Sequence, residues 1–255
     1  SIPQAIPQIE IAVGDEDAAL ILRHLEPLTS ADLMRLHEFY QAHGIAIYLQ
    51  SKGPDTIHCL TDPAMSLSYS LPEWEVSLAF QPQQFVQVNA AINAQLVSKA
   101  IQWLELGPDD RVLDLFCGLG NFTLPMARVA AEVVGVEGAQ DLVDSARNNA
   151  ARNKIGNAVF HAADLTLDPD KQPFLREAYD AVLIDPPRSG AEDVLPLVAK
   201  SGARRVVYVS CNPATLARDA GLLVAEHGYR LVEAGVADMF PHTAHVESMA
   251  LFVKH

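Results

Sequence analysis

The sequence predicts a small α+β domain followed by an α/β domain with a doubly wound, mainly parallel sheet. Three observations support this fold class. Short strands around a single helix account for residues 1–84, as in an α+β module. From residue 111 onward, apolar runs alternate with segments of helical period, the pattern of parallel strands joined by crossover helices. The last two runs have no helix between them, so we expect them to form an antiparallel pair.

In the first domain, an acidic turn at residues 14–17 separates the apolar runs Ile9–Val13 and Ala19–Leu25, which predicts a β-hairpin. Thr29 and Asp32 have the spacing of a capping box, and the apolar residues that follow recur at helical period. A helix is therefore expected from residue 30. The remaining strands of this domain are expected at Ile45–Gln50, Thr56–Leu60, Ser66–Leu71 and Glu75–Phe80.

The second domain, residues 85–255, is expected to start with a helix that Asn89 caps and that ends before Gly107 and Pro108. Seven strands are then expected at Arg111–Phe116, Glu132–Val136, Ala158–Ala163, Ala181–Asp185, Arg205–Ser210, Arg230–Gly235 and Val246–Val253. The helices between them are expected within Thr123–Val129, Gln140–Asn153, Ala191–Lys200 and Thr215–His227.

Composition narrows the function classes. The net charge is −14, and residues 1–85 are the most acidic part, with 11 acidic and 3 basic side chains. RNA-binding surfaces normally show a basic excess, so strong RNA binding by these residues is not favoured. Three scattered cysteines without a CxxC spacing argue against disulfides and against zinc or iron–sulfur sites, and they favour the reducing cytoplasm. No apolar run is long enough for a membrane span.

A strand, a Gly118-x-Gly120 loop and a helix start follow one another in residues 112–122, which predicts a cofactor loop. Glu137 ends the next strand, where an acid can bind ribose hydroxyls. The third glycine of a dinucleotide fingerprint is missing, and Asp114 would repel a pyrophosphate. The pattern therefore favours a cofactor without phosphates, and S-adenosylmethionine fits. The alternative is a plain strand-to-helix turn with a solvated Glu137.

Cys211 ends a buried strand and precedes Asn212 and Pro213. Because ligands bind at the carboxyl ends of strands in open α/β sheets, we expect the thiol to point into a site. A position near a helix start favours the nucleophilic thiolate. The alternative is a buried structural cysteine. His242 and His245 could bind a metal together with Cys211, but a metal would quench the nucleophile, so we expect none.

Five motifs resemble the RNA 5-methyluridine methyltransferases, and they occur in the family's order. They are Phe85-x-Gln87-Val88-Asn89, Asp114-Leu115-Phe116-Cys117-Gly118-x-Gly120-Asn121-Phe122, Ile184-Asp185-Pro186-Pro187-Arg188-Ser189-Gly190, Ser210-Cys211-Asn212-Pro213-Ala214-Thr215-Leu216 and Phe240-Pro241-His242-Thr243-x-His245-x-Glu247. The resemblance covers nearly the whole chain, because residues 9–80 also resemble the family's central domain. It implies a Rossmann-like, seven-stranded methyltransferase sheet, S-adenosylmethionine as cofactor and an RNA substrate. The last motif is most similar to the branch that acts on 23S ribosomal RNA, with a tRNA enzyme as the alternative.

The resemblance also implies the site residues. Cys211 is expected to add to carbon 6 of uracil, and Glu247, as a buried and partly desolvated base, to remove the proton from carbon 5. Without the resemblance, Glu247 would be read as a surface acid. Asp185 is expected to contact the target base or the cofactor. The residues expected to line the cofactor pocket are Gln87, Phe116, Gly118, Asn121, Glu137, Asp164 and Asp185.

The family's N-terminal RNA-binding module and its iron–sulfur cysteines have no counterpart in these residues. We therefore expect the cluster only in a further N-terminal part, and we expect weak RNA binding by this chain. Arg188 and Arg218 are the basic residues expected to touch the substrate. A non-catalytic RNA-binding or assembly protein of the same fold is the alternative, and the set Cys211, Glu247 and Asp185 argues against it. We infer no membrane contact and no obligate protein partner.

Overall fold

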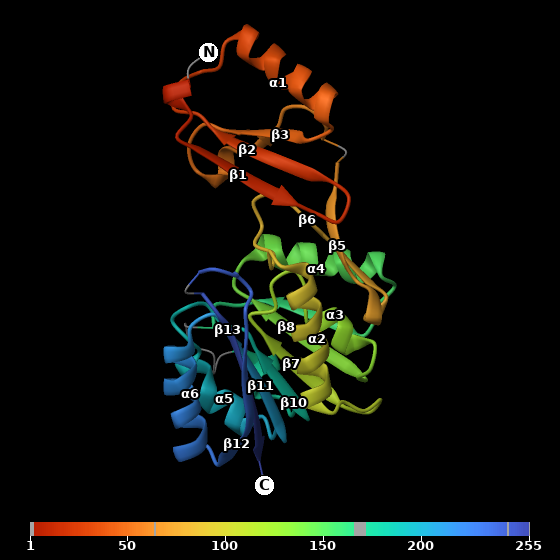
Figure 1. Ribbon diagram of the computed structural model, residues 1–255. Coiled ribbons are helices and arrows are strands. Elements are labelled where there is room, and N and C mark those ends of the chain that lie inside the picture. The colour runs from red at the N-terminus through yellow and green to blue at the C-terminus, as the bar shows by residue number, and fades with distance from the viewer. Residues whose placement is uncertain (1–2, 64, 166–171, 244, 255) are drawn as a thin grey trace. The chain divides into compact units, whose positions relative to one another are not determined.

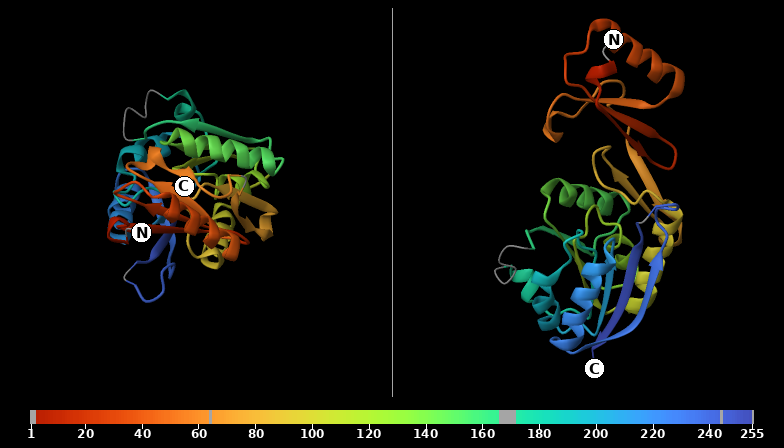
Figure 2. Two further views of the ribbon diagram at one scale, coloured as in Figure 1. Left: turned by 90° about the horizontal axis from the view of Figure 1, so that it is seen from above. Right: turned by 60° about the vertical axis from the view of Figure 1, so that its left-hand side comes forward.

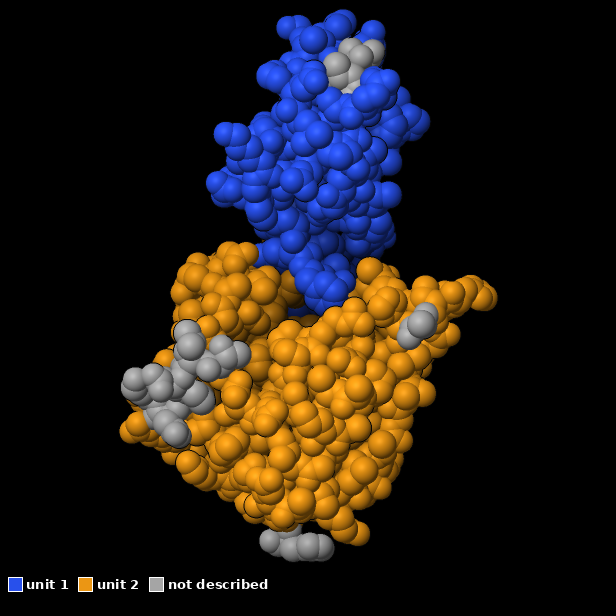
Figure 3. All heavy atoms as spheres, turned by 90° about the vertical axis from the view of Figure 1, so that its left-hand side faces the viewer, with its two compact units in different colours: residues 1–70, 77–86 blue, residues 71–76, 87–255 orange. Residues whose placement is uncertain are grey.

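The computed structural model describes residues 3–63, 65–165, 172–243 and 245–254 (Figure 1). The chain divides into two compact units, coloured separately in Figure 3. The first comprises residues 1–70 and 77–86, and the second comprises residues 71–76 and 87–255. The domain boundary expected after residue 84 stays a prediction.

The first unit contains a four-stranded sheet with the order β1-β2-β3-β4. Its strands are β1 (Gln8–Val13), β2 (Ala18–Arg23), β3 (Ala46–Gln50) and β4 (His58–Cys59). The predicted hairpin is confirmed, since β1 and β2 pair antiparallel. β2 and β3 pair in parallel, with a helical crossover between them. The strand expected at Thr56–Leu60 is shorter because Pro54 starts a 3-10 turn, Pro54–Thr56, and the strand begins only after it.

The crossover helix α1 (Ser30–His43) begins as predicted. The backbone nitrogen of Asp32 donates to Thr29 Oγ1 at 3.2 Å, and the backbone nitrogen of Thr29 donates to Asp32 Oδ2 at 3.1 Å. This reciprocal capping box satisfies two amide groups at the start of the helix. The helix ends at Gly44, whose φ of 70° suits a left-handed cap.

β5 (Leu67–Leu71) and β6 (Val76–Phe80) pair as a separate two-stranded sheet, and both strands were predicted. The described 3-10 helices other than Pro54–Thr56 are Pro3–Ala5, Pro72–Trp74, Pro173–Arg176 and Glu192–Val194. Each of the first three begins at a proline, whose fixed φ suits the first helical position.

The second unit contains a seven-stranded sheet with the order β12-β13-β11-β10-β7-β8-β9. Its strands are β7 (Arg111–Leu115), β8 (Glu132–Glu137), β9 (Ala158–Ala162), β10 (Ala181–Ile184), β11 (Arg205–Ser210), β12 (Tyr229–Ala237) and β13 (Glu247–Lys254). The neighbouring strands β11, β10, β7, β8 and β9 pair in parallel, whereas β13 is antiparallel to both of its neighbours, β11 and β12. The predicted fold class and the antiparallel final pair are confirmed.

The strand order reverses direction between β7 and β10. The chain fills one half of the sheet with β8 and β9 and then returns to fill the other half, starting at β10. Ligands bind at such a switch point, outside the carboxyl ends of the strands. The loops that follow β7 and β10 therefore define where a site is expected.

Helices cover both faces of the sheet. They are α2 (Ala90–Leu104), α3 (Thr123–Ala127), α4 (Gln140–Arg152), α5 (Leu195–Lys200) and α6 (Pro213–Ala225). Figures 1 and 2 show α2 on one face and α5 and α6 on the other. The core beneath α5 and α6 contains Tyr208, Phe252 and Leu223, each fully or almost fully buried.

Two helix starts differ from the prediction. The helix expected over Ala191–Lys200 is a 3-10 turn followed by α5, because Pro196 lacks an amide hydrogen and is tolerated only in the first turn. The helix expected from Thr215 starts at Pro213, with Asn212 as its N-cap; Asn212 Oδ1 accepts from the backbone nitrogen of Ala214 at 3.2 Å.

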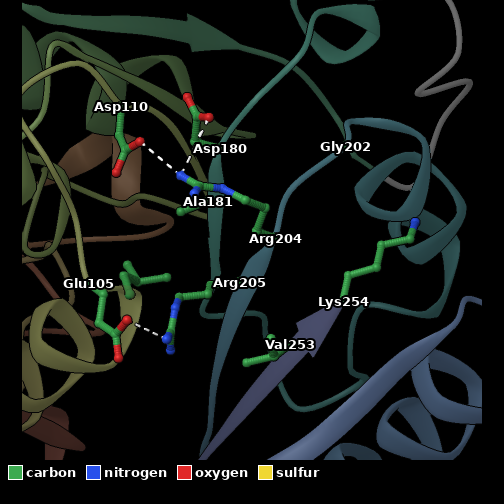
Figure 4. A pocket seen from close by; sticks show the side chains of 10 residues that line it. Glu105, Asp110, Asp180, Ala181, Gly202, Arg204, Arg205, Val253 and Lys254 are labelled. Carbon is green, nitrogen blue, oxygen red and sulfur yellow. Dashed lines mark hydrogen bonds and ion pairs between the residues drawn. The ribbon is translucent and has the colours of Figure 1, made fainter.

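A pocket of about 440 Å³ lies at the amino ends of β10 and β11 (Figure 4). Arg204 Nη2 lies 3.1 Å from Asp110 Oδ1 and 3.7 Å from Asp180 Oδ1, and Arg205 pairs with Glu105. Both arginines are thus engaged with carboxylates of the protein. The pocket lies at the amino ends of the parallel strands, whereas the switch-point loops lie at their carboxyl ends. We assign the pocket no ligand.

In the described part of the chain, no helix is long and apolar enough to cross a membrane.

Candidate active site

Strand pairing brings Cys211 and Glu247 together. β11 and β13 run antiparallel, and the last partners in their register are Ser210 and Ser248. Cys211 directly follows Ser210, and Glu247, the first residue of β13, directly precedes Ser248, so the two residues adjoin the same end of the ladder. Glu247 is only 4% exposed, and Cys211 is partly buried. Two predicted residues that lie 36 positions apart in sequence therefore occupy one edge of the sheet.

Asp185 and Arg188 come from the loop that follows β10, the strand next to β11. The backbone nitrogen of Asp185 donates to the carbonyl of Leu115 at 3.2 Å, which places Asp185 at the carboxyl end of β7. Burial raises the pKa of Asp185 to about 7, and the nearby Glu247 carboxylate adds to this shift. Asp185 thus lies between the loop after β7 and the edge that carries Cys211.

The surroundings of the Cys211 thiol do not favour its thiolate. Burial raises the pKa of the thiol, the carboxylates of Glu247 and Asp185 raise it further, and the Arg188 guanidinium lowers it. The net shift is upward. Burial and two carboxylates outweigh one cation here, so the expectation that a nearby helix start favours the thiolate stays a prediction. Burial also raises the pKa of Glu247, as expected for a desolvated base.

The predicted cofactor loop leaves β7 in a constrained conformation. Phe116 has a φ of 65°, a left-handed value that is uncommon for a bulky residue. The backbone nitrogens of Phe116 and Cys117 both donate to the carbonyl of Val136, at 2.8 and 3.0 Å. Gly118 has a φ of 55°, and a Cβ placed on it would meet nothing within 4 Å. One side of this loop is therefore open.

Glu137 closes the loop from the end of β8. Its Oε2 accepts from the backbone nitrogen of Gly118 at 3.2 Å, and its Oε1 accepts from that of Ala139 at 3.0 Å. Each carboxylate oxygen has a second lone pair that can accept another hydrogen bond. Glu137 thus shapes the loop and can still bind hydroxyl groups.

Two polar pairs support the loop from α2 and α3. Asn121 and Asn93 exchange amide hydrogen bonds in both directions at 2.9 Å. Thr123 Oγ1 donates to Asp114 Oδ2 at 2.5 Å. Burial raises the pKa of Asp114 to about 8, and the charges of Asp185 and Glu137 contribute to the shift. The sequence analysis did not predict a role for Asn93 or Thr123. For Asn93, the available signal was a polar residue on the apolar face of a predicted helix.

The site has unused hydrogen-bonding capacity. Gln87 Oε1 and Asp114 Oδ1 are buried without a partner in the described part of the chain. Buried acceptors are normally satisfied, so such atoms are expected where a ligand or water binds. Gln87 lies two residues before Asn89, the N-cap of α2. Asp164 is exposed, two residues after the end of β9. Gln87 thus lies near a helix start and Asp164 near a strand end, and their place in a cofactor pocket stays a prediction.

Arg218 makes hydrogen bonds within the protein. Its Nε donates to Asp219 Oδ1 at 2.8 Å, and its Nη2 donates to the carbonyl of Ser189 at 3.0 Å. A fully buried carboxylate next to it in sequence thus engages its guanidinium, and the expectation that it touches RNA stays a prediction. Among the described residues, no group of three or more His, Cys, Asp or Glu side chains is arranged to hold a metal ion.

Comparison with known proteins identifies the family. The sequence pattern of the family described as tRNA (uracil-5-)-methyltransferase matches residues 18–255. The chain belongs to this family. The resemblance inferred from the five motifs is confirmed.

Within the tRNA (uracil-5-)-methyltransferase family, two similar curated proteins carry the same name. The chain is 58% identical over 253 residues to 23S rRNA (uracil(1939)-C(5))-methyltransferase RlmD of Alkalilimnicola ehrlichii, and this match covers 99% of the chain. It is 55% identical over 249 residues, 98% of the chain, to RlmD of Xanthomonas campestris pv. campestris. The matches cover 57% and 56% of those proteins, so the chain spans little more than half of their length.

Solved structures agree on the fold. The tRNA (uracil-54, C5)-methyltransferase of Pyrococcus abyssi, crystallised with S-adenosyl-L-homocysteine, matches with a TM-score of 0.74 and 27% identity. That match covers 95% of this chain and 58% of the other. TYW2 of M. jannaschii, crystallised with AdoMet, matches with a TM-score of 0.60 and 14% identity, covering 96% of this chain and 100% of the other. The second likeness supports the methyltransferase fold alone.

Proposed function

We propose that these residues form the catalytic part of an RNA uracil-5-methyltransferase that uses S-adenosylmethionine and acts on 23S ribosomal RNA. The observation that carries the proposal is the β11–β13 register, which brings a cysteine and a buried glutamate to the same end of the ladder beside Asp185. A thiol and a base at one edge are the groups that carbon-5 methylation of uracil requires. A non-catalytic protein with this fold has no use for such a pair.

The cofactor is assigned to the open loop after β7. Gly118 and Phe116 would lie against it, Glu137 would accept from its ribose hydroxyls, and the free acceptor Gln87 Oε1 suits its ammonium group. Asn121 and Asp164 complete the proposed pocket, with Asp164 assigned to the adenine amino group. When bound, S-adenosylmethionine supplies the methyl group as an electrophile.

Cys211 would start the reaction by adding as thiolate to carbon 6 of uracil. The new C–S bond turns carbon 5 into an enolate-like nucleophile, which is needed because uracil carbon 5 is otherwise too weak to be methylated. Once carbon 5 carries both a methyl group and a proton, Glu247 would take that proton. The electron pair re-forms the double bond between carbons 5 and 6, and the C–S bond breaks to release Cys211.

The protonation of the carboxylates matters for this sequence. Glu247 has to be ionised when it accepts the proton, and burial makes that ionisation costly, which strengthens it as a base. Asp185, with its pKa raised to about 7, can be protonated near neutral pH and can then donate a hydrogen bond to a uracil carbonyl. Arg188 opposes the effect of the carboxylates on the thiol.

Ribosomal RNA is preferred over tRNA as the substrate. The relatives at 55–58% identity are named as 23S rRNA enzymes, whereas the tRNA enzyme of known structure is 27% identical. Transcripts of the 23S target region and of a tRNA, each tested with the chain and S-adenosylmethionine, separate the two substrates.

Covalent trapping tests the proposed function. RNA containing 5-fluorouridine should accumulate as a covalent complex, because fluorine at carbon 5 cannot leave as a proton does. We expect the complex with the unsubstituted chain and with Cys117→Ala, but not with Cys211→Ala. Cys117 is a fair control, since it is buried in the cofactor loop. A complex that persists in Cys211→Ala would refute the proposal. So would the absence of a complex at RNA concentrations that saturate the chain.

A further inference from the structure

Asp219, on α6, is a buried charge outside the proposed chemical machinery. Its side chain is 0% exposed. Its Oδ2 accepts from the Tyr208 hydroxyl at 2.6 Å and from the backbone nitrogen of Ala191 at 2.8 Å, and its Oδ1 is bonded to Arg218. A buried carboxylate is costly, and well-packed apolar residues would often be at least as stable in its place. Stability alone is therefore a weak reason for Asp219 to be there.

Asp219 and its partner Arg218 both make hydrogen bonds to one loop, residues 185–191, which carries Asp185 and Arg188. Asp219 itself holds the amide of Ala191, and Arg218 holds the carbonyl of Ser189 at 3.0 Å. Asn212 Nδ2 holds the carbonyl of Arg188 at 2.9 Å. Three main-chain groups within four consecutive residues of the loop are thus bound by α6 or by its N-cap.

Gly190 shows how closely the loop is held. Its φ is 87°, and a Cβ added to it would lie 2.5 Å from Arg218 Nη2 and 2.7 Å from Asp219 Oδ2. No side chain fits in that space. The loop backbone therefore packs directly on the Arg218–Asp219 pair.

We propose that Asp219, together with Arg218 and Tyr208, is a positioning group that holds loop 185–191 against the start of α6 and so sets Arg188 beside Cys211. The inference rests on the proposed function in that it takes Cys211 as the nucleophile. Cys211 directly precedes Asn212, the N-cap of the helix that carries Asp219. The nucleophile and the loop are thus both anchored at the N-terminal end of α6.

The consequence is electrostatic. The charged groups that face the thiol are Glu247 from β13 and Asp185 and Arg188 from the loop, and only Arg188 favours the thiolate. Arg188 is exposed, and a loosened loop would let its guanidinium move away from the thiol, whereas Glu247 would remain on its strand. The thiol would then ionise at higher pH. A purely structural role for Asp219 would lower stability without this change.

The test is the pH profile of Cys211 alkylation by iodoacetamide, measured on the 255-residue chain by mass spectrometry of the peptide that contains Cys211. Tyr208→Phe removes one of Asp219's donors and Asp219→Asn removes the charge. We expect both to raise the midpoint of the profile, Asp219→Asn by about half a unit or more, which is about a threefold loss of thiolate below the midpoint. Arg218→Lys, which keeps the charge, should shift it less than Arg218→Met.

Tyr229→Phe is the matched control. Tyr229 is another buried tyrosine of the same core, and its hydroxyl donates to the carbonyl of Ala203 at 2.9 Å, near the amino end of β11. It should lose a similar amount of stability in urea unfolding but keep the wild-type midpoint. Tyr208→Phe retains the Arg218 and Ala191 contacts of Asp219, so it remains informative even if Asp219→Asn does not fold.

The outcomes are separable from those of the proposed function. An unchanged midpoint in folded Tyr208→Phe and Arg218→Met would overturn the positioning role, whatever the result of covalent trapping. An equal shift in Tyr229→Phe would overturn it as well, since the effect would then be a general loss of packing. A shifted midpoint combined with a covalent RNA complex in Cys211→Ala would support the positioning and refute Cys211 as the nucleophile.

Discussion

Ser248 on β13 donates its side-chain hydroxyl to the main-chain carbonyl of Ser210 on β11, at 2.9 Å. Both residues are buried, and they are partners in the antiparallel register. Ser210 is the residue before Cys211, and Ser248 is the residue after Glu247, so the bond lies beside both of them at the point where β11 ends. A side chain thus reinforces the sheet next to the proposed catalytic pair, where the main-chain ladder stops.

The Ser248→Ala variant should therefore affect both stability and catalysis. Loss of the buried hydrogen bond should cost about 1 kcal/mol of unfolding free energy in urea, and formation of the 5-fluorouridine complex should slow. Ser201→Ala is the control, because that buried hydroxyl donates to the carbonyl of Val198 at 2.7 Å, away from the site. Equal slowing in both variants would contradict a local role for Ser248.

Glu247→Gln should separate the two halves of the proposed reaction. Thiol addition and methylation do not need a base at carbon 5, whereas release of the product does. The variant should therefore accumulate methylated RNA bound through Cys211 without any fluorouridine, visible in denaturing electrophoresis. Glu233→Gln, at an exposed acid on the neighbouring strand β12, should behave like the unsubstituted chain. Normal turnover by Glu247→Gln would remove this residue from the mechanism.

The buried carboxyl of Asp114 should make stability depend on pH. Its pKa is raised to about 8 in the folded chain from an ordinary value of 3.8, so the folded state holds a proton that the unfolded state releases. Its contribution to stability is full below about pH 4 and is lost as pH rises toward 8. Asp114→Asn, which keeps an acceptor for Thr123, should reduce the loss of unfolding free energy between pH 5 and pH 8.

Urea unfolding at the two pH values measures this difference, which we expect to reach at least about 1 kcal/mol. The control is Asp109→Asn, at an exposed position before β7, which should leave the pH dependence as it is. The same pH dependence in Asp114→Asn and the unsubstituted chain would show that Asp114 ionises normally.

Glu137→Ala should weaken binding of S-adenosylhomocysteine by about 1–3 kcal/mol in calorimetry, since ribose hydroxyls would lose a buried acceptor. Glu132→Ala is the control, because Glu132 lies at the other end of the same strand and pairs with Arg111. We expect it to bind like the unsubstituted chain. Tighter binding of NAD than of S-adenosylhomocysteine would overturn the assignment of the pocket.

RNA affinity should be low for these residues alone. Extruding a uridine from its stack costs a few kcal/mol, which contacts to phosphates have to repay, whereas the chain has a net charge of −14. Arg218, one of the expected contacts, is engaged with Asp219. Filter binding at one fixed salt concentration should show weaker RNA binding by the chain than by the full-length Alkalilimnicola relative. Equal affinity would place the recognition surface within these 255 residues.

Local sequence signals were sufficient for most elements. The Thr29–Asp32 spacing predicted a capping box, and the structure has one. The alternation of strands and helices predicted the parallel sheet, and the missing helix before the last strand predicted its antiparallel end. These features depend on residues close together in the chain, so periodicity and capping chemistry determine them. Errors fell at Pro54, where a 3-10 turn shortened a strand, and at Pro196 and Pro213, where a proline moved a helix start by a few residues.

The sequence by itself determined the family and the residues proposed to carry the chemistry, because Cys211, Glu247, Asp185 and the glycine loop occur in recognisable motifs and the chain belongs to the family that those motifs resemble. Only the tertiary structure decided what surrounds them. Strand register placed Cys211 and Glu247 next to the paired residues Ser210 and Ser248, burial and two carboxylates raised the pKa of the thiol, and the buried Asp219 engaged Arg218. Charges and desolvation act through space between segments far apart in the chain, and no local pattern records them.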